Sequence, residues 1–477
     1  MVSVIDVIVC IAYFVVVIGV GIFASKKAKS KEDFLVAGRS LPLPMFTAAM
    51  SAVVIGGGLT IGGTTLAYDS GIAGIWVGGM YAVSIFLLAW LLRTKMSNMR
   101  ILSTNEAVGI FYGPYARTVS ALIMLIYLFM IAVLNVVSIG TVLSIMTGLS
   151  PTVSMIIGGA IIVTYITIGG MYAVAFTDII QFIVMTVGVI LILPILGLID
   201  IGGFGALEVG LPAEAFDVTS IGPSRIIAYI FLLVPGFLVG QDVWQKAFTA
   251  KSSKVAKKGT LLASGYIFLY AVATVIIGMC IAVAVPNLEN SDLAFATAAA
   301  EFCPGGVKGI VLAAALASIM STANGGIIGS ATVIFNDMIA VKRPDIDGKK
   351  AINTTRVLIV IVCVCSVVCA IFIQSVLVAL DVAYAYLSGC VFVPLVLAFI
   401  LKKVSAKAGL VSLVASFVTV TALFFIFGIT STYPIIIGMI VSIVLFFGIN
   451  AADRKNKHSI DFEGEKVIVD GEVKISD

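Results

Sequence analysis

Apolar segments of about twenty residues, separated by short polar loops, recur throughout this 477-residue chain. That length matches a helix that crosses the hydrocarbon core of a bilayer, whereas barrel strands would alternate apolar and polar residues over about ten positions. Hydrophobic residues make up 61% of the chain and charged residues only 11%, a balance foreign to water-soluble globular proteins. The sequence therefore predicts an all-α polytopic membrane protein.

About thirteen transmembrane helices are predicted. Their approximate ranges are 4–24, 44–68, 72–93, 117–147, 151–169, 174–198, 224–249, 259–285, 306–336, 354–373, 376–401, 408–428 and 432–450. The first segment has neither a basic flank nor a small-residue cleavage site, so we interpret it as a retained span rather than a signal peptide.

The loops between the spans differ in charge. Basic residues follow the first, third, seventh, ninth and eleventh spans, whereas the loops 199–223 and 286–305 contain acidic residues and no Lys or Arg. Basic loops stay on the cytoplasmic side of a membrane. The pattern predicts a multi-pass protein of the cell membrane with its N-terminus outside and its C-terminus in the cytoplasm.

Two spans carry residues that interrupt helices. The second contains Gly56, Gly57 and Gly58 in a row, and the seventh contains Pro235-Gly236 followed by Gly240. Non-helical backbone survives at membrane depth only where it is buried in protein or lines a cavity. Two breaks five spans apart favour an inverted-repeat transporter with its site between them. Close packing through small residues is the alternative interpretation.

The ninth span presents small and hydroxyl-bearing residues on one face. Ser318, Ser321, Thr322 and Gly325 are spaced at i, i+3, i+4 and i+7. Such a face is typical of a helix-packing seam. Two adjacent hydroxyls beside carbonyls freed by a broken helix also suit Na⁺. The residue types alone leave both interpretations open.

Asp178 lies where the segment Gly169–Gln181 runs into the apolar residues 182–198. A carboxylate at or inside a span is costly unless a partner or a cation compensates its charge. Asp178 is therefore a candidate to hold a cation or a proton.

Three segments carry a resemblance to a known family. The loop Glu32–Arg39, the segment Gly169–Gln181 and the helix segment Ala317–Thr322 resemble motifs of the sodium/solute symporter family, which includes proline, sugar, sialic acid and choline transporters. The resemblance covers about 440 residues and implies a five-plus-five inverted-repeat (LeuT-like) core with one extra span before it and two after it.

The resemblance also implies a division of the chain. Residues 1–43 would form the first span and a basic cytoplasmic loop, 44–198 the first five-helix repeat and 224–401 the second, inverted repeat. Residues 402–450 would form two additional spans. The remaining residues, 451–477, form a polar tail in which 466–475 is predicted to be a β-hairpin around an Asp-Gly turn.

The same resemblance implies a sodium site. Its ligands would be the carbonyls of Ala52, Ile55 and Ser318 and the hydroxyls of Ser321 and Thr322. A two-residue slip in the second span would move two of the carbonyls to Val54 and Gly57. Some members hold a second cation at the signature aspartate, which implies a possible second site at Asp178 and Asn324.

The solute site is less defined by the sequence. Gly56, Gly57 and Gly58 allow a ligand to approach the backbone closely, and the polar candidates for a cavity are Thr60, Asn135 and Gln241. Val54, Ile131 and Gly240 stand where the choline branch has tryptophans, so an aromatic cage is not evident. Asp381 in the eleventh span would meet a cationic group or hydrogen-bond to neighbouring helices.

The leading hypothesis is a sodium-coupled symporter that imports a small polar organic solute by alternating access. A proton-coupled symporter of the same fold, using Asp178, is the alternative. No intramembrane histidine, nucleotide-binding loop or metal-ligand spacing of cysteines is present, so an enzyme or a membrane sensor is disfavoured and no cofactor beyond Na⁺ as coupling ion is expected. Broken helices around a midplane site fit occlusion of a solute better than the continuous pore of a channel. The expected partners are the solute, Na⁺ and the lipid bilayer, without nucleic acid.

Overall fold

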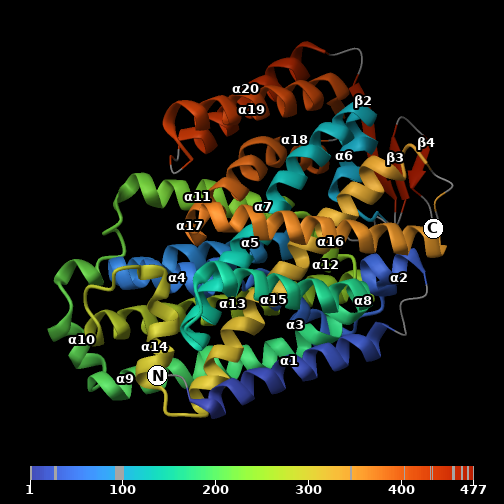
Figure 1. Cartoon of the computed structure of the whole chain (residues 1–477). Helices are drawn as coiled ribbons and strands as arrows, with labels where there is room; N and C mark the ends of the chain where they lie inside the picture. The colour runs from blue at the N-terminus through green and yellow to red at the C-terminus, as the bar shows by residue number, and fades with distance from the viewer. Residues whose placement is uncertain are drawn as a thin grey trace.

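The computed structural model describes residues 3–25, 30–91, 101–343, 346, 348–401, 403–429, 431, 433–453, 457–463, 466–469 and 472–475. Figure 1 shows a bundle of long helices with the two chain ends at opposite ends of the bundle. The end with α9, α10 and α14 is called the N-terminal side, and the end with α2, α6 and the strands is called the tail side.

The elements follow one another in a simple order. The helices are α1 (Val4–Ser25), α2 (Lys31–Val36), α3 (Leu43–Val54), α4 (Gly57–Ser70), α5 (Ile75–Leu91), α6 (Thr104–Tyr112), α7 (Pro114–Thr147), α8 (Pro151–Met185), α9 (Leu193–Ile201), α10 (Phe204–Gly210), α11 (Gly222–Val239), α12 (Gln241–Ala247), α13 (Ser253–Ala284), α14 (Ala294–Phe302), α15 (Val307–Val333), α16 (Gly348–Ile373), α17 (Val376–Tyr386), α18 (Phe392–Ile400), α19 (Ala406–Phe427) and α20 (Tyr433–Ala452).

Short turns of tighter or wider helix join some of these. They are η1 (Ala37–Arg39), η2 (Gly71–Gly74), η4 (Thr186–Ile192), η5 (Ala213–Phe216), η6 (Ser291–Leu293), η7 (Ile334–Ile339) and η8 (Leu387–Val391), and the strands are β1 (Lys403–Ser405), β2 (Lys457–Glu463), β3 (Lys466–Val469) and β4 (Glu472–Ile475).

Within the described residues, eleven helices are long and apolar enough to cross a membrane. The predicted number was about thirteen, and the difference has two sources. The interrupted second span is divided into α3 and α4, and α4 continues through η2 into α5. The predicted span 151–169 forms the first part of α8, of which the apolar stretch Pro151–Thr164 is short. The predicted all-helical membrane architecture is confirmed.

Helix α15 forms the centre of the bundle. In its membrane-length stretch 94% of the residues are buried, compared with 28% in α1 and α19. The Gly, Ala and Ser residues along α15 let other helices approach it closely, and it packs against α1, α3, α7 and α8. By contrast, α19 and α20 pack on each other at one edge of the bundle (Figure 1).

Both predicted helix breaks are present. Helix α3 ends at Val54, Ile55 and Gly56 are extended, and α4 begins at Gly57. Helix α11 ends at Val239 and α12 begins at Gln241, with Gly240 extended between them. The second break therefore falls at Gly240, and Pro235 remains inside α11. Each break leaves backbone groups that need other partners in the membrane interior.

The segment Gly169–Gln181 contains a sharp turn. Gly170 has φ 55° and ψ −153° and separates two helical parts of α8. A Cβ atom at Gly170 would lie 2.6 Å from Cδ2 of Phe34 on α2. The loop Glu32–Arg39 and the segment Gly169–Gln181, distant in sequence, therefore pack against each other, and the Tyr172 and Ser40 hydroxyls lie 3.2 Å apart at the same contact.

The polar tail forms part of a sheet. The predicted hairpin is confirmed in β3 and β4, which pair antiparallel with Ile468 opposite Val473; its Asp-Gly turn lies outside the described residues. The sheet has the order β1-β2-β3-β4. Because β1 directly precedes α19, the hairpin is joined to the bundle rather than isolated.

We expect Gly170→Ala to destabilise the protein. The conformation of Gly170 is almost restricted to glycine, and such strain costs about 1–3 kcal/mol; the added methyl group would also meet the Phe34 ring. Thermal unfolding in detergent should show a lower midpoint than the wild type. Gly19→Ala is the control, because a Cβ at Gly19 meets no atom within 4 Å. Equal midpoints for the two variants would contradict the role assigned to Gly170.

Candidate cation and solute sites at the helix breaks

The end of α3 exposes carbonyl oxygens to α15. The last carbonyls of a helix have no intrahelical donor. The Thr322 hydroxyl of α15 donates to these carbonyls instead. It lies 2.9 Å from the Val53 carbonyl and 3.4 Å from the Ala52 carbonyl. Three oxygens from two helices therefore converge at a buried point, and oxygen is the ligand that hard cations prefer.

The predicted sodium ligands are only partly brought together. The Thr322 hydroxyl and the Ala52 carbonyl, two of the predicted ligands, lie next to each other, and the Val53 carbonyl joins them. Ser318 was predicted to contribute its carbonyl; its hydroxyl lies 2.8 Å from the Thr60 hydroxyl. Ile55 lies in the extended stretch of the break, and its N–H donates to the Ser51 carbonyl at 3.1 Å.

Ser321 and Asp178 form a second buried cluster. The Ser321 hydroxyl donates to Asp178 Oδ1 at 2.6 Å, and the Lys246 ammonium of α12 forms an ion pair with Asp178 Oδ2. The side chains of Asp178 and Lys246 are 0% and 1% exposed. The positive charge beside Asp178 is thus supplied by the chain itself.

The cluster bears on the possible second cation site at Asp178 and Asn324. Asn324 is buried on α15, three residues after Ser321. The partners that the structure gives Asp178 are Lys246 and Ser321. The sequence contained both charges, but a separation of 68 residues offered no signal that they pair.

The glycine run at the first break is required by close packing on three sides. A Cβ at Gly56 would lie 2.4 Å from Thr322 Oγ1, one at Gly57 2.0 Å from Ser138 Oγ, and one at Gly58 2.7 Å from the Tyr81 hydroxyl. Glycine therefore lets the break contact α15, α7 and α5 at once. Gly57 faces α7, whereas Gly56 and Gly58 line a cavity described below.

Thr60 and Asn135 support the broken helix. Asn135 Oδ1 accepts the Gly57 N–H at 3.1 Å, and its Nδ2 donates to the Ile131 carbonyl at 2.7 Å. The Thr60 hydroxyl lies 2.8 Å from both the Tyr270 and the Ser318 hydroxyls. Two of the predicted solute-binding residues thus satisfy backbone and hydroxyl groups around the break.

Gln241 is directed toward the tail side. Its Oε1 accepts the Thr104 N–H at 2.8 Å, and its Nε2 donates to the Leu102 carbonyl at 3.0 Å. The side chain therefore fastens the second break to the start of α6. It is not among the residues that line the cavity at the breaks.

A small cavity lies between the two breaks. Its volume is about 10 Å³, roughly the room for one water molecule, so the breaks are closed around it. It is lined by Val54, Gly56, Gly58, Tyr81, Ile131, Leu134, Phe237, Asp242, Thr322, Leu380 and Tyr384.

The cavity contains a carboxylate, Asp242, that was not among the predicted solute-binding residues. Asp242, two residues after the break at Gly240, is 2% exposed and accepts a hydrogen bond from the Tyr127 hydroxyl at 3.0 Å. The aromatic rings of the lining, those of Tyr81, Phe237 and Tyr384, come from α5, α11 and α17. An aromatic lining was not evident in the sequence because residues so far apart share no local pattern. The position of Asp242, two residues after Gly240, was the local signal that could have placed this carboxylate in the cavity.

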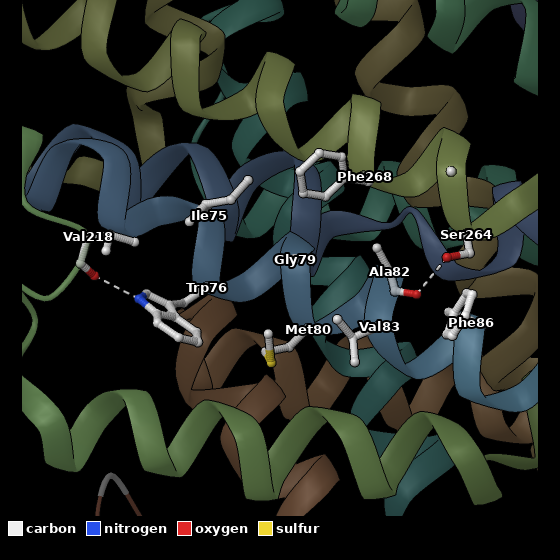
Figure 2. A pocket seen from close by; sticks show the side chains of 11 residues that line it. Ile75, Trp76, Gly79, Met80, Ala82, Val83, Phe86, Val218, Ser264 and Phe268 are labelled. Carbon is white, nitrogen blue, oxygen red and sulfur yellow. Dashed lines mark hydrogen bonds between the residues drawn. The ribbon is translucent and has the colours of Figure 1, made fainter.

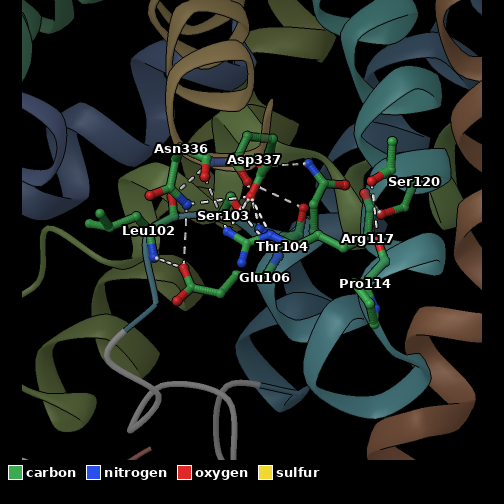
Figure 3. A network of polar contacts seen from close by, with 12 residues as sticks. Leu102, Ser103, Thr104, Glu106, Pro114, Arg117, Ser120, Asn336 and Asp337 are labelled. Carbon is green, nitrogen blue, oxygen red and sulfur yellow. Dashed lines mark hydrogen bonds and ion pairs between the residues drawn. The ribbon is translucent and has the colours of Figure 1, made fainter. Parts of the chain in front are cut away.

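Polar contacts close the path on the tail side (Figure 3). Asp337 of η7 pairs with Arg117 at 2.7 Å and accepts hydrogen bonds from Ser103 at 2.8 Å and Asn105 at 3.1 Å. These residues join η7, the start of α6 and the start of α7. Together with Gln241 they hold the second break against α6.

An ion pair stands on the N-terminal side. Asp381 of α17 lies 3.3 Å from Arg225 of α11, whose guanidinium is 4.8 Å from the Tyr229 ring centroid. Of the two sequence-based interpretations of Asp381, the contact matches a carboxylate paired with a neighbouring helix. The pair leaves Asp242 as the carboxylate that faces the central cavity.

A larger cavity of about 540 Å³ lies between α5 and α13. Figure 2 shows its lining, in which Trp76 Nε1 donates to the Val218 carbonyl at 2.7 Å and Ser264 donates to the Ala82 carbonyl at 2.8 Å. The remaining lining is apolar and includes no charged residue. Its chemistry suits hydrocarbon, so the small cavity with Asp242 is the better candidate for a polar solute.

Comparisons with solved structures agree with this architecture. A Na⁺-coupled sialic acid symporter in a substrate-bound outward-open state superposes with a TM-score of 0.80 at 18% identity, covering 94% of this chain and 98% of that chain. MhsT in complex with L-phenylalanine superposes with a TM-score of 0.55 at 13% identity, covering 86% and 98%. At these identities the likeness shows a shared fold with an inverted-repeat, LeuT-like core.

Relatives of known function are similar over most of the chain. The sodium/proline symporter of Escherichia coli (strain K12) is 25% identical over 467 residues, covering 92% of this chain and 91% of that protein. The sodium/glucose cotransporter of Vibrio parahaemolyticus is 26% identical over 469 residues, covering 87% and 84%. The high-affinity choline transporter 1 of Drosophila melanogaster is 23% identical over 397 residues, and the match spans only 64% of that transporter.

The family model described as the sodium:solute symporter family matches residues 34–416, which include both helix breaks, the turn at Gly170 and α15. The match extends over most of the chain. This chain belongs to the sodium:solute symporter family.

Proposed function

We propose that the protein is a sodium-coupled symporter that moves a small polar organic solute across the cell membrane by alternating access. One observation carries the proposal: Thr322, whose hydroxyl meets the Ala52 and Val53 carbonyls, also lines the cavity that contains Asp242. A cation bound at these oxygens and a solute bound in the cavity would therefore share a wall.

The proposed sodium site uses groups that already converge. Na⁺ would be held by the Ala52 and Val53 carbonyls and by the Thr322 hydroxyl, which must turn its oxygen toward the ion. The Ile55 and Ser318 carbonyls remain proposed ligands, and the Ser321 hydroxyl would need to turn away from Asp178 to join them. Binding would draw α3 toward α15 and so favour one conformation of the break, which is how a ligand shifts a conformational equilibrium.

Alternating access would require the two sides to open in turn. The Asp337 cluster and Gln241 close the tail side, and the Arg225–Asp381 pair lies on the other side. We propose that 44–198 and 224–401 are the two repeats that move against each other, with the additional spans and the tail outside this core. The basic loops favour an extracellular N-terminus and a cytoplasmic tail.

Proton coupling through Asp178 is the second candidate function. The carboxylate is deeply buried, as a proton carrier in a membrane protein would be. The Lys246 ammonium and the Ser321 hydroxyl already compensate its charge, which favours a supporting electrostatic role beside the sodium site. The same pair disfavours a second Na⁺ at Asp178 and Asn324. A radiolabelled uptake screen in proteoliposomes, with and without a sodium gradient, tests the coupling ion directly.

We expect Thr322→Val to weaken sodium binding by roughly tenfold or more, which corresponds to about 1.4 kcal/mol. Valine keeps the shape of threonine but removes the oxygen that meets the α3 carbonyls. The sodium concentration for half-maximal thermal stabilisation of purified protein is the measurement. Thr355→Val is the matched control, because the Thr355 hydroxyl bonds only to the Ala351 carbonyl of its own helix. Identical sodium dependence in both variants would refute the site.

We expect Asp178→Asn to lower sodium affinity without making uptake respond to a pH gradient. The measurement is uptake into proteoliposomes under an imposed sodium gradient or an imposed pH gradient. Lys246→Met breaks the same ion pair but keeps the carboxylate, so it separates loss of the pair from loss of the negative charge. Wild-type uptake driven by a pH gradient in the absence of sodium, and lost in Asp178→Asn, would establish proton coupling instead.

A further inference from the structure

Asp242 is a buried carboxylate without a compensating basic side chain in its cavity. The residues that line the cavity, all within the described part of the chain, include no Lys or Arg. Lys246, one helical turn further along α12, pairs with Asp178, and Arg225 pairs with Asp381. The groups that hydrogen-bond to Asp242 are the Tyr127 hydroxyl and the backbone N–H groups of Asp242 and Val243.

Aromatic rings enclose this carboxylate. The ring centroids of Tyr81 and Phe237 are 4.3 Å apart, those of Phe237 and Tyr384 4.9 Å apart, and those of Tyr384 and Tyr127 5.2 Å apart. Four rings from four helices thus form a continuous wall. The faces of aromatic rings carry partial negative charge and attract cations. The wall and the carboxylate therefore favour positive charge in the same space.

We propose that the transported solute carries a protonated amine, which binds between Asp242 and this aromatic wall; the inference rests on the proposed symport. A buried charge is costly unless it is paired and hydrogen-bonded. An ammonium group would pair with Asp242, and its N–H groups would donate to the carboxylate and to the hydroxyls of Tyr127 and Tyr384. An anionic or uncharged solute would leave the carboxylate without a counter-charge.

The arrangement also selects among amines. A primary or secondary ammonium can donate N–H hydrogen bonds to a carboxylate, whereas a quaternary ammonium has none to donate. The cavity volume of about 10 Å³ means that the breaks must separate before any solute enters. Asp242 is the second residue of α12, two residues after the extended Gly240, so opening of this break would move the carboxylate that holds the amine.

The coupling ion and the amine would bind beside one cavity. Its lining includes Gly56 and Thr322, next to the proposed sodium site, and also Asp242 and Tyr384. Two positive charges would then be balanced by Asp242 and by the carbonyl and hydroxyl dipoles of the first break. Closure of the cavity around both ligands would make the binding of the ion and the binding of the amine depend on each other.

Substrate-induced currents from proteoliposomes on a solid-supported membrane test the inference. The probes are ethanolamine and L-alanine as amines, choline as a quaternary ammonium, and D-glucose and lactate as uncharged and anionic solutes, each with and without sodium. At least one of the two amines should give sodium-dependent currents roughly tenfold larger than those of D-glucose and lactate, with choline weaker. The wild-type panel does not depend on the folding of any variant.

Variants then assign the effect to Asp242. Asp242→Asn should lose the amine response while keeping the thermal stabilisation by sodium, which also shows that the variant folds. Asp242→Glu keeps the charge and should retain part of the response. Asp217→Asn is the control, because Asp217 lies in an exposed loop where it accepts hydrogen bonds from Thr219.

The outcomes separate this inference from the proposed function. Sodium-dependent currents with D-glucose or lactate alone, an absence of any amine response, or a wild-type amine response in Asp242→Asn would overturn the amine assignment while leaving symport in place. Amine currents that are identical with and without sodium would instead overturn sodium coupling and leave the amine site standing.

Discussion

Backbone groups at the first helix break need partners, and much of the centre of this protein is arranged to supply them. In a membrane interior, water does not solvate the carbonyls at the end of α3 or the N–H groups at the start of α4. Asn135 accepts the Gly57 N–H, and Thr322 donates to the carbonyls of Ala52 and Val53. The glycine run allows this because it removes the side chains that would keep α7 and α15 away.

The same need explains how the break becomes a site. A hydroxyl that hydrogen-bonds to two carbonyls can also coordinate a cation together with them, because all three groups offer lone pairs. Helix α15 contributes this hydroxyl to the break and, one residue earlier, the Ser321 hydroxyl to Asp178. Thr322 at the break and Ser321 at Asp178 are thus neighbours on α15, and Lys246, the partner of Asp178, lies on the same helix α12 as Asp242.

Three carboxylates inside the described part of the bundle are paired with a basic side chain, whereas Asp242 is not. Asp178 is paired with Lys246, Asp337 with Arg117 and Asp381 with Arg225, whereas Asp242 has a tyrosine and backbone N–H groups. A buried ion pair adds little net stability, but removing one member is costly, so such pairs tie helices together at fixed points. Asp242, which has no basic partner among the described residues, faces the cavity, where a ligand can complete the pairing.

Periodicity and composition were sufficient for the membrane class, the helix breaks and the hairpin of the tail, because each depends on residues close together in sequence. Resemblance added the proximity of Ala52 and Thr322, whose carbonyl and hydroxyl oxygens lie 3.4 Å apart. Thr60, Asn135 and Gln241 were assigned to a cavity because they are polar residues within spans, and they do not line it. Polarity inside a span identifies a residue that needs a partner, but it does not tell whether that partner is a ligand or a neighbouring backbone group.

The sequence by itself determined that this chain spans a membrane, that two of its helices are interrupted, and that Asp178 must be compensated. Only the tertiary structure decided that Lys246 compensates it, that Val53 shares the Thr322 hydroxyl, and that Asp242 bonds to Tyr127 and shares a cavity with rings from three other helices. The reason is physical. Local backbone propensity acts over a few residues, whereas the partner of a buried charge is chosen by the packing of helices that lie far apart in the chain.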